Sequence, residues 1–173
     1  MKMFKRLTAV AVLTGAALAA TPASAAPVAV TGTKPQAKVT ILKPLVLTKT
    51  ADLNFGTILL GTFTGSVNVS MNQAGTLTCG TGVTCSGTTS VGGYNVKGTN
   101  KQVVTISAPN VTMQNQTTAG SSIVVTLSAP ATVTLPNSGT TGTDFAVGGS
   151  FSIDSNTVDG VYAGDMNVTV DYQ

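Results

Sequence analysis

Apolar and polar residues alternate with a period of two along much of this chain, as they do in β-strands that bury one face. The clearest runs are residues 66–72, 144–154 and 165–172. In the last run, the apolar positions are Met166, Val168, Val170 and Tyr172. After the first 25 residues, no segment sustains the apolar period of an α-helix. The pattern therefore predicts an all-β protein.

Shorter strands are expected between these runs, separated by glycine and asparagine turns. Their predicted ranges are 37–49, 55–60, 76–79, 90–97, 102–107, 122–128 and 132–135. About ten short strands at this spacing predict an antiparallel β-sandwich or a barrel. Within the run 144–154, Gly148 and Gly149 predict a bulge or a close approach of two backbones.

The first 25 residues have the three regions of a secretory signal peptide. Lys2, Lys5 and Arg6 precede an apolar stretch over residues 7–20, and Ala23-Ser24-Ala25 matches a cleavage motif. The alternative is a transmembrane anchor, but the stretch is shorter than the roughly 20 residues that span a bilayer. We expect an exported protein that starts at Ala26 and has no transmembrane anchor.

Residues 26–36 differ from the rest because they are small, flanked by proline and without bulky side chains. We expect a flexible extension here and a β-domain over residues 37–173. Val28 and Val30 alternate with smaller or polar residues, and Val39 and Ile41 share one face of the following segment. An alternating terminal segment can pair within its own sheet or add to the sheet edge of another molecule.

Removing the signal peptide changes the charge of the chain. Nine cationic residues less Lys2, Lys5 and Arg6 leave six lysines, which balance the six aspartates. The basic isoelectric point of the precursor therefore gives no support for binding to nucleic acid or to a membrane surface.

Cys79 and Cys85 are the only cysteines. In an exported protein, a pair this close in sequence predicts a structural disulfide that closes a tight hairpin. A Cys-x-x-Cys redox motif has a different spacing, and a metal site needs more ligands.

The chain has no histidine and no glutamate, which removes every Ser-His-Asp and Cys-His arrangement. A Ser-Lys dyad and a pair of catalytic aspartates stay formally open, but Lys97 and Lys101 lie in turn-like surroundings. The spacing of Asp154, Asn156 and Asp159 fails the calcium-loop template. We predict no enzyme, no catalytic residues, no cofactor and no metal site.

Residues 45–58, 145–149, 160–164 and 168–172 resemble the bacterial domain-of-unknown-function 4402 family. They are also similar to the spore-coat-protein-U-like pilins of the chaperone–usher pathway. That similarity implies an immunoglobulin-like sandwich without its last strand, which a periplasmic chaperone and then the extension of the next subunit would supply. Tyr172 matches a tyrosine near the C-terminus of those pilins, and the donor strand would lie within residues 28–41. The cysteine pair departs from their longer-range disulfide.

These observations predict a structural or adhesive surface protein, with a fimbrial subunit as the leading interpretation. The expected partners are further copies of the chain or a periplasmic chaperone and usher, in the periplasm, at the cell surface or outside the cell. The residues expected to make subunit contacts are Val28, Val30, Val39, Ile41, Met166, Val168, Val170 and Tyr172. The alternative is a self-complete, monomeric immunoglobulin-like domain that binds sugar or protein.

Overall fold

A computed structural model describes residues 25–136 and 141–173 of the chain. The predicted signal peptide lies outside the described residues except for Ala25. The internal contacts divide the chain into two units, 1–39 and 40–173, and each is described by itself. The described part of the first unit, residues 25–39, contains no strand.

The second unit is built from antiparallel strands, so the all-β prediction is confirmed. The strands are β1 (Val46–Ala51), β2 (Thr57–Leu60), β3 (Ser66–Met71), β4 (Leu77–Cys79), β5 (Val83–Ser86), β6 (Gly92–Lys97), β7 (Val103–Ser107), β8 (Val111–Asn115), β9 (Ser122–Ser128), β10 (Thr132–Thr134), β11 (Thr143–Asp154), β12 (Tyr162–Ala163) and β13 (Thr169–Tyr172). We expected about ten strands; β5, β8 and β12 are additional.

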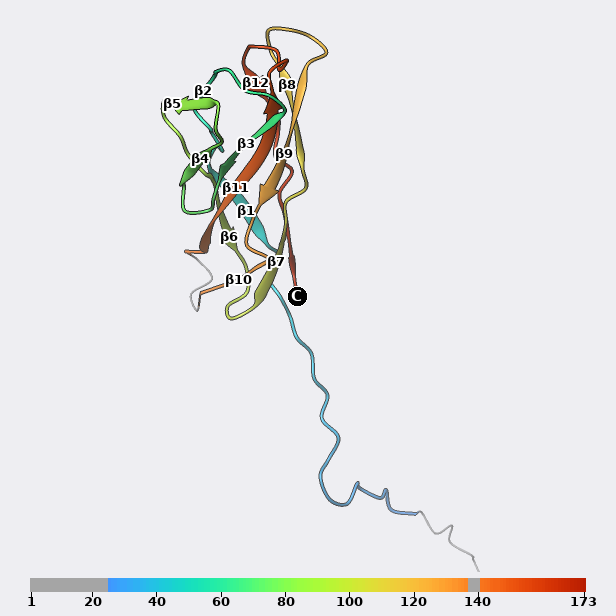
Figure 1. Cartoon of the computed structure of the whole chain (residues 1–173). Helices are drawn as coiled ribbons and strands as arrows, with labels where there is room; N and C mark the ends of the chain where they lie inside the picture. The colour runs from blue at the N-terminus through green and yellow to red at the C-terminus, as the bar shows by residue number, and fades with distance from the viewer. Residues whose placement is uncertain (1–24, 137–140) are drawn as a thin grey trace, which may run out of the picture. The chain divides into compact units, whose positions relative to one another are not determined.

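Three sheets make up this unit (Figure 1). The largest has the order β1-β6-β11-β9-β8-β12, with β3 on β11 and β4 on β3. A three-stranded sheet, β10-β7-β13, and a two-stranded sheet, β2-β5, complete the fold. Side chains of β7 and β13 pack with those of β6 and β11, which makes the domain a β-sandwich.

Strand β11 pairs with different strands along its length. Its first residues, 143–147, pair with β6, and residues 149–154 pair with β3. A side chain at Gly148 would collide with the backbone carbonyl of Met71, so a glycine is needed where the two strands meet. The glycine pair predicted a bulge or a close backbone approach, and the structure has the close approach.

The core has two clusters that share Leu127 at their boundary. In one cluster, the rings of Tyr94 and Phe145 stack with their centroids 5.4 Å apart. In the other, Phe55 meets Phe151 edge to face at 4.9 Å. Val69, Val96, Val104 and Val147 are 0% exposed. Each of these side chains stabilises the fold by about 1.5 to 3 kcal/mol through removal of apolar surface from water.

Two of the predicted strands are shorter in the structure. Residues 37–45 of the range 37–49 form no strand, and β1 starts at Val46. Within the run 165–172, only Thr169–Tyr172 form the strand β13. The registers of β12 on β8 and of β13 on β7 place residues 164–168 beside residues 108–113. Pro109 lies in that stretch and has no N–H to donate, so the ladder is interrupted there.

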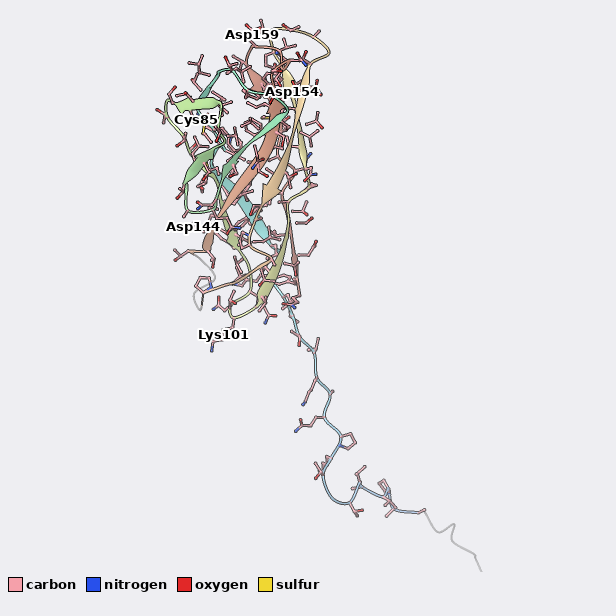
Figure 2. The ribbon with its side chains drawn as sticks, in the orientation of Figure 1. Cys85, Lys101, Asp144, Asp154 and Asp159 are labelled. Carbon is pink, nitrogen blue, oxygen red and sulfur yellow. A yellow bond between two sulfur atoms is a disulfide. The ribbon has the colours of Figure 1, made fainter. Side chains whose placement is uncertain are left out.

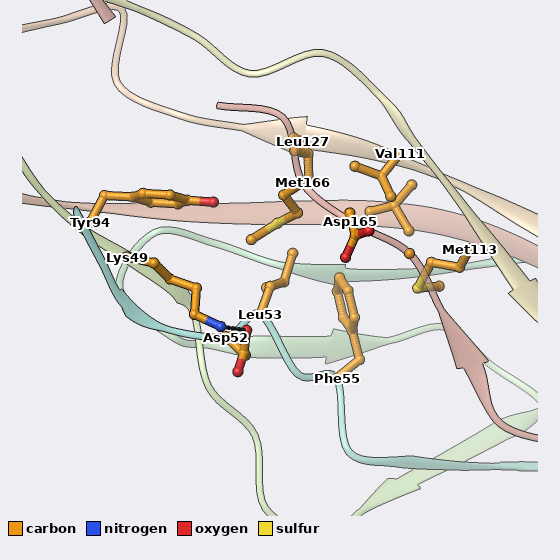
Figure 3. Close-up of a pocket in the computed structure, with 12 residues that line it drawn as sticks. Lys49, Asp52, Leu53, Phe55, Tyr94, Val111, Met113, Leu127, Asp165 and Met166 are labelled. Carbon is orange, nitrogen blue, oxygen red and sulfur yellow. Dashed lines mark hydrogen bonds and ion pairs between the residues drawn. The ribbon is translucent and has the colours of Figure 1, made fainter. Parts of the chain in front are cut away.

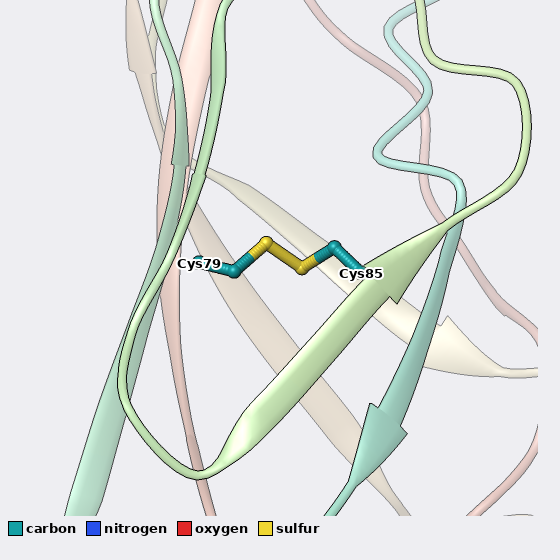
Figure 4. Close-up of a disulfide and its surroundings, with 2 residues drawn as sticks. All are labelled: Cys79 and Cys85. Atoms are coloured by element: carbon teal, nitrogen blue, oxygen red, sulfur yellow. A yellow bond between two sulfur atoms is a disulfide. The ribbon is translucent and has the colours of Figure 1, made fainter.

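The predicted disulfide between Cys79 and Cys85 is present (Figure 4). The prediction of a paired hairpin around it is wrong, because β4 pairs with β3 and β5 pairs with β2. The bond therefore ties the two-stranded sheet to the main sheet.

Candidate subunit interface

Strands β1 and β13 each have one free edge. In the part of the chain that the structure describes, β1 pairs only with β6, and β13 pairs only with β7. A free edge presents backbone N–H and C=O groups that can accept another strand. Either of these edges is therefore open to an added strand.

A pocket of about 200 Å³ lies between the end of β1 and the segment that leads into β13 (Figure 3). Its lining comprises Lys49, Asp52, Leu53, Phe55, Tyr94, Val111, Met113, Val125, Leu127, Gly164, Asp165 and Met166. Most of these side chains are apolar. The pocket thus lies beside the free edge of β1 and the segment before β13, and its surface combines apolar side chains with polar groups. Strand-accepting sites likewise combine a backbone edge with recesses for alternate side chains.

Three charged side chains line this pocket. The Lys49 ammonium donates a hydrogen bond of 2.7 Å to Asp52, and both side chains are exposed to solvent. That hydrogen bond, the negative charge of Asp52 and the more distant Asp165 raise the pKa of Lys49. Burial raises the pKa of the Tyr94 phenol, which keeps its ring neutral beside the pocket.

Asp52 and Asp165 both line the pocket, and the sequence left open a pair of catalytic aspartates of the glycosidase type. However, the Asp52 side chain is 78% exposed and paired with Lys49. The general acid of a glycosidase is normally held in an apolar site away from cations, which the surroundings of Asp52 do not provide.

The far end of the two edges is closed by Tyr172. Its hydroxyl donates a hydrogen bond of 2.6 Å to the Lys43 carbonyl and accepts one of 2.7 Å from the Thr99 backbone N–H. The Lys43 N–H in turn donates to the Thr99 hydroxyl. The last strand is therefore tied to Lys43, which only Pro44 and Leu45 separate from the start of β1 at Val46.

The structure separates the predicted contact residues into two groups. Met166, Val168, Val170 and Tyr172 are half-buried and pack against the core of their own domain. What β13 can offer a partner is therefore its backbone edge and not these side chains.

The other predicted contact residues face solvent. Their exposed fractions are 94% for Val28, 59% for Val30, 82% for Val39 and 83% for Ile41. None of them belongs to a strand. The segment 28–41 thus carries exposed apolar side chains at alternating positions.

No pattern in the sequence marked Leu53, Phe55 and Tyr94 as residues of a pocket. Leu53 and Phe55 lie within the family-like segment 45–58, which was the available signal. Among residues 25–136 and 141–173, no three His, Cys, Asp or Glu side chains gather as a metal site would require. The same described residues contain no helix of the length and hydropathy needed to cross a bilayer.

Comparison with known families gives one match, which spans residues 45–172 and so includes both free edges and the pocket. No curated protein and no solved structure matches the chain. The chain therefore belongs to the family described as Domain of unknown function (DUF4402).

Proposed function

We propose that this protein is an exported structural subunit of a surface fibre, of the fimbrial type, whose copies join by strand complementation. The extension of one copy adds as a strand to the free edges beside the pocket of the next copy. One observation carries the proposal: the chain has unpaired strand edges next to an apolar pocket and also an exposed, alternating apolar segment.

The physical basis is that an added strand satisfies two needs at once. Its backbone forms ladder hydrogen bonds with β1 or β13, and its alternate side chains contact the apolar residues of the pocket. Burying Val39 and Ile41, now 82% and 83% exposed, would contribute about 1.5 to 3 kcal/mol for each side chain. Lysines of the extension would meet aspartates near the pocket, which favours faster association and a single register.

The similarity of residues 45–58 and 168–172 to chaperone–usher pilins supports the same proposal. It adds an immunoglobulin-like topology for the sandwich, a periplasmic chaperone that covers the free edges before assembly, and an usher. We further propose that the finished fibre lies at the bacterial cell surface and has a structural role.

The test uses the purified chain that starts at Ala26. Unboiled samples on a denaturing gel should show a ladder of oligomers that heating reduces to monomer, because a strand held by a full ladder dissociates slowly. The double substitution Val39→Ser and Ile41→Ser should abolish the ladder. Val161→Ser is the matched control, since Val161 is 67% exposed but lies outside both the extension and the pocket. A ladder that survives the double substitution contradicts the proposal.

A second candidate is a self-complete surface domain that binds sugar or protein as a monomer. The Tyr172–Lys43 hydrogen bond and the packing of β13 on its own core favour this candidate. It predicts one band, boiled or unboiled, and a monomer that stays folded after residues 26–36 are removed.

A further inference from the structure

A second depression lies at one end of the sandwich, where the start of β3, the start of β9, the end of β11 and β12 meet. Its volume is about 360 Å³. Its lining comprises Ser66, Ser121, Ser122, Ile123, Val124, Ser152, Ile153, Asp154, Asn156, Thr157, Val158 and Tyr162. None of these residues lines the pocket between β1 and β13. Figure 2 shows Asp154 and Asp159 near this end of the domain and Lys101 at the other.

Part of the polar lining is already used by the fold. One oxygen of Asp154 accepts hydrogen bonds from the Asn156 N–H at 2.8 Å and from the Thr157 hydroxyl at 3.3 Å. The Tyr162 hydroxyl donates to the Val158 carbonyl at 2.6 Å. These bonds fix the loop that follows β11, so one wall of the depression is rigid.

The remaining polar groups have no protein partner. Within the described residues, the hydroxyls of Ser66, Ser121, Ser122 and Ser152 and the side-chain amide of Asn156 make no hydrogen bond. Each hydroxyl can both donate and accept, and the amide supplies two donors and one acceptor. The depression thus gathers five side chains whose hydrogen-bonding capacity is free for a ligand.

The charge of the lining restricts the class of ligand. No lysine lines the depression, so phosphate, sulfate and carboxylate groups would find no cation there. Asp154 is the one carboxylate, too few for a divalent cation. An uncharged ligand rich in hydroxyl groups fits these conditions.

Apolar side chains complete the lining. Val124 is 54% exposed and Val158 is 37% exposed. Tyr162 is half-buried and lies on β12, which pairs with β8. Sugar rings carry hydroxyl groups at their rim and C–H groups on their faces, so they need both kinds of surface. We propose that this depression binds a neutral oligosaccharide, with the serines and Asn156 holding the hydroxyl groups.

This inference does not depend on strand complementation, because the two pockets share no residue. The experiment uses the full chain from Ala26 and three uncharged hexasaccharides: a β-1,4-glucan, an α-1,4-glucan and a β-1,4-linked N-acetylglucosamine chain. We expect at least one to bind with a millimolar or lower dissociation constant, measured by NMR titration. The amide shifts should centre on Ser122, Ser152 and Asn156.

Two substitutions test the position of the site. Ser152→Tyr fills the depression and should abolish binding. Asn156→Ala removes one amide from an exposed loop and should weaken binding about three- to tenfold while leaving the fold intact. Ser107→Tyr is the matched control, since Ser107 is an exposed strand serine on the other sheet.

Three outcomes overturn the inference. One is that none of the three hexasaccharides binds at millimolar concentration. Another is that neither Ser152→Tyr nor Asn156→Ala changes an observed affinity. The third is that a sulfated hexasaccharide binds more tightly at the same amides, which the absence of a lysine from the lining excludes.

Discussion

At the scale of single residues, Tyr172 has a different role from the one its position in the sequence indicates. Alternation placed it on the same face as Val170 and Val168, in a strand expected to contact a partner. In the structure, its ring packs on the core, and its hydroxyl joins Lys43 to Thr99. A side chain that connects positions this far apart in sequence stabilises the domain against opening at that end.

The substitution Tyr172→Phe tests this role. It keeps the ring in the core and removes both hydrogen bonds, so the free energy of unfolding should fall by about 2 kcal/mol. Tyr162→Phe is the control, because the Tyr162 hydroxyl makes a single bond, to Val158, and its loss should cost about 1 kcal/mol. Urea unfolding followed by circular dichroism measures both. Equal effects from the two substitutions would contradict the proposed role of Tyr172.

At the scale of strands, alternation predicted the buried faces well. Val67, Val69 and Met71 are buried in β3, as their spacing indicated, and Phe145, Val147, Phe151 and Ile153 are buried in β11. These strands lie inside a sheet, where both the face and the partners are fixed. Periodicity therefore identifies strands that have neighbours on both sides.

Periodicity failed where a partner was absent or irregular. Residues 37–45 alternate but form no ladder of backbone hydrogen bonds. Alternation shows which face of a strand is apolar, and it does not show whether a neighbouring strand is present to pair with it. Strand β8 was missed because it directly follows Pro109 and Asn110, which mark a stop in the sequence. The pocket could not be predicted from the sequence either, because its lining residues come from strands and loops far apart in the chain.

The disulfide gives a prediction at the scale of strands. The two-stranded sheet β2-β5 is held mainly by its own backbone bonds, including the one from the Gly61 N–H to the Gly82 carbonyl that extends its ladder. Replacing Cys79 and Cys85 with alanine should lower the free energy of unfolding by about 2 kcal/mol, the effect of releasing a short closed loop.

Hydrogen exchange locates the effect of that double substitution. Amides of β2 and β5 should lose protection first, while those of β3 and β11 keep theirs, because only the tie between the sheets is lost. A uniform loss of protection over the whole domain would show that the disulfide stabilises the fold globally instead.

At the scale of the whole molecule, the charge of the chain from Ala26 onward is nearly independent of pH. Histidine is the side chain whose charge ordinarily changes between pH 5 and 8, and this chain has no histidine. Protonation of side chains therefore cannot switch association on or off between about pH 5.5 and 8.

We expect the electrophoretic mobility of this chain to stay near zero over that range, apart from the single charge of the terminal amine. The oligomer ladder proposed above should likewise be unchanged between about pH 5.5 and 7, measured on the same gel. High salt supplies the contrast, since it screens lysine–aspartate attraction and should slow assembly. Assembly that depends steeply on pH in this window would contradict this account of the charges.

The hydrogen bond between Tyr172 and Lys43 also has a consequence for protein engineering. It places the last strand of the domain beside the residue at which the chain enters it. A short linker from Gln173 to Lys43 would therefore suffice for a circular permutant, with new ends in the β8–β9 turn at Gly120. By the same geometry, an affinity tag fused after Gln173 would crowd the root of the extension, and an insertion at Gly120 is the better position for one.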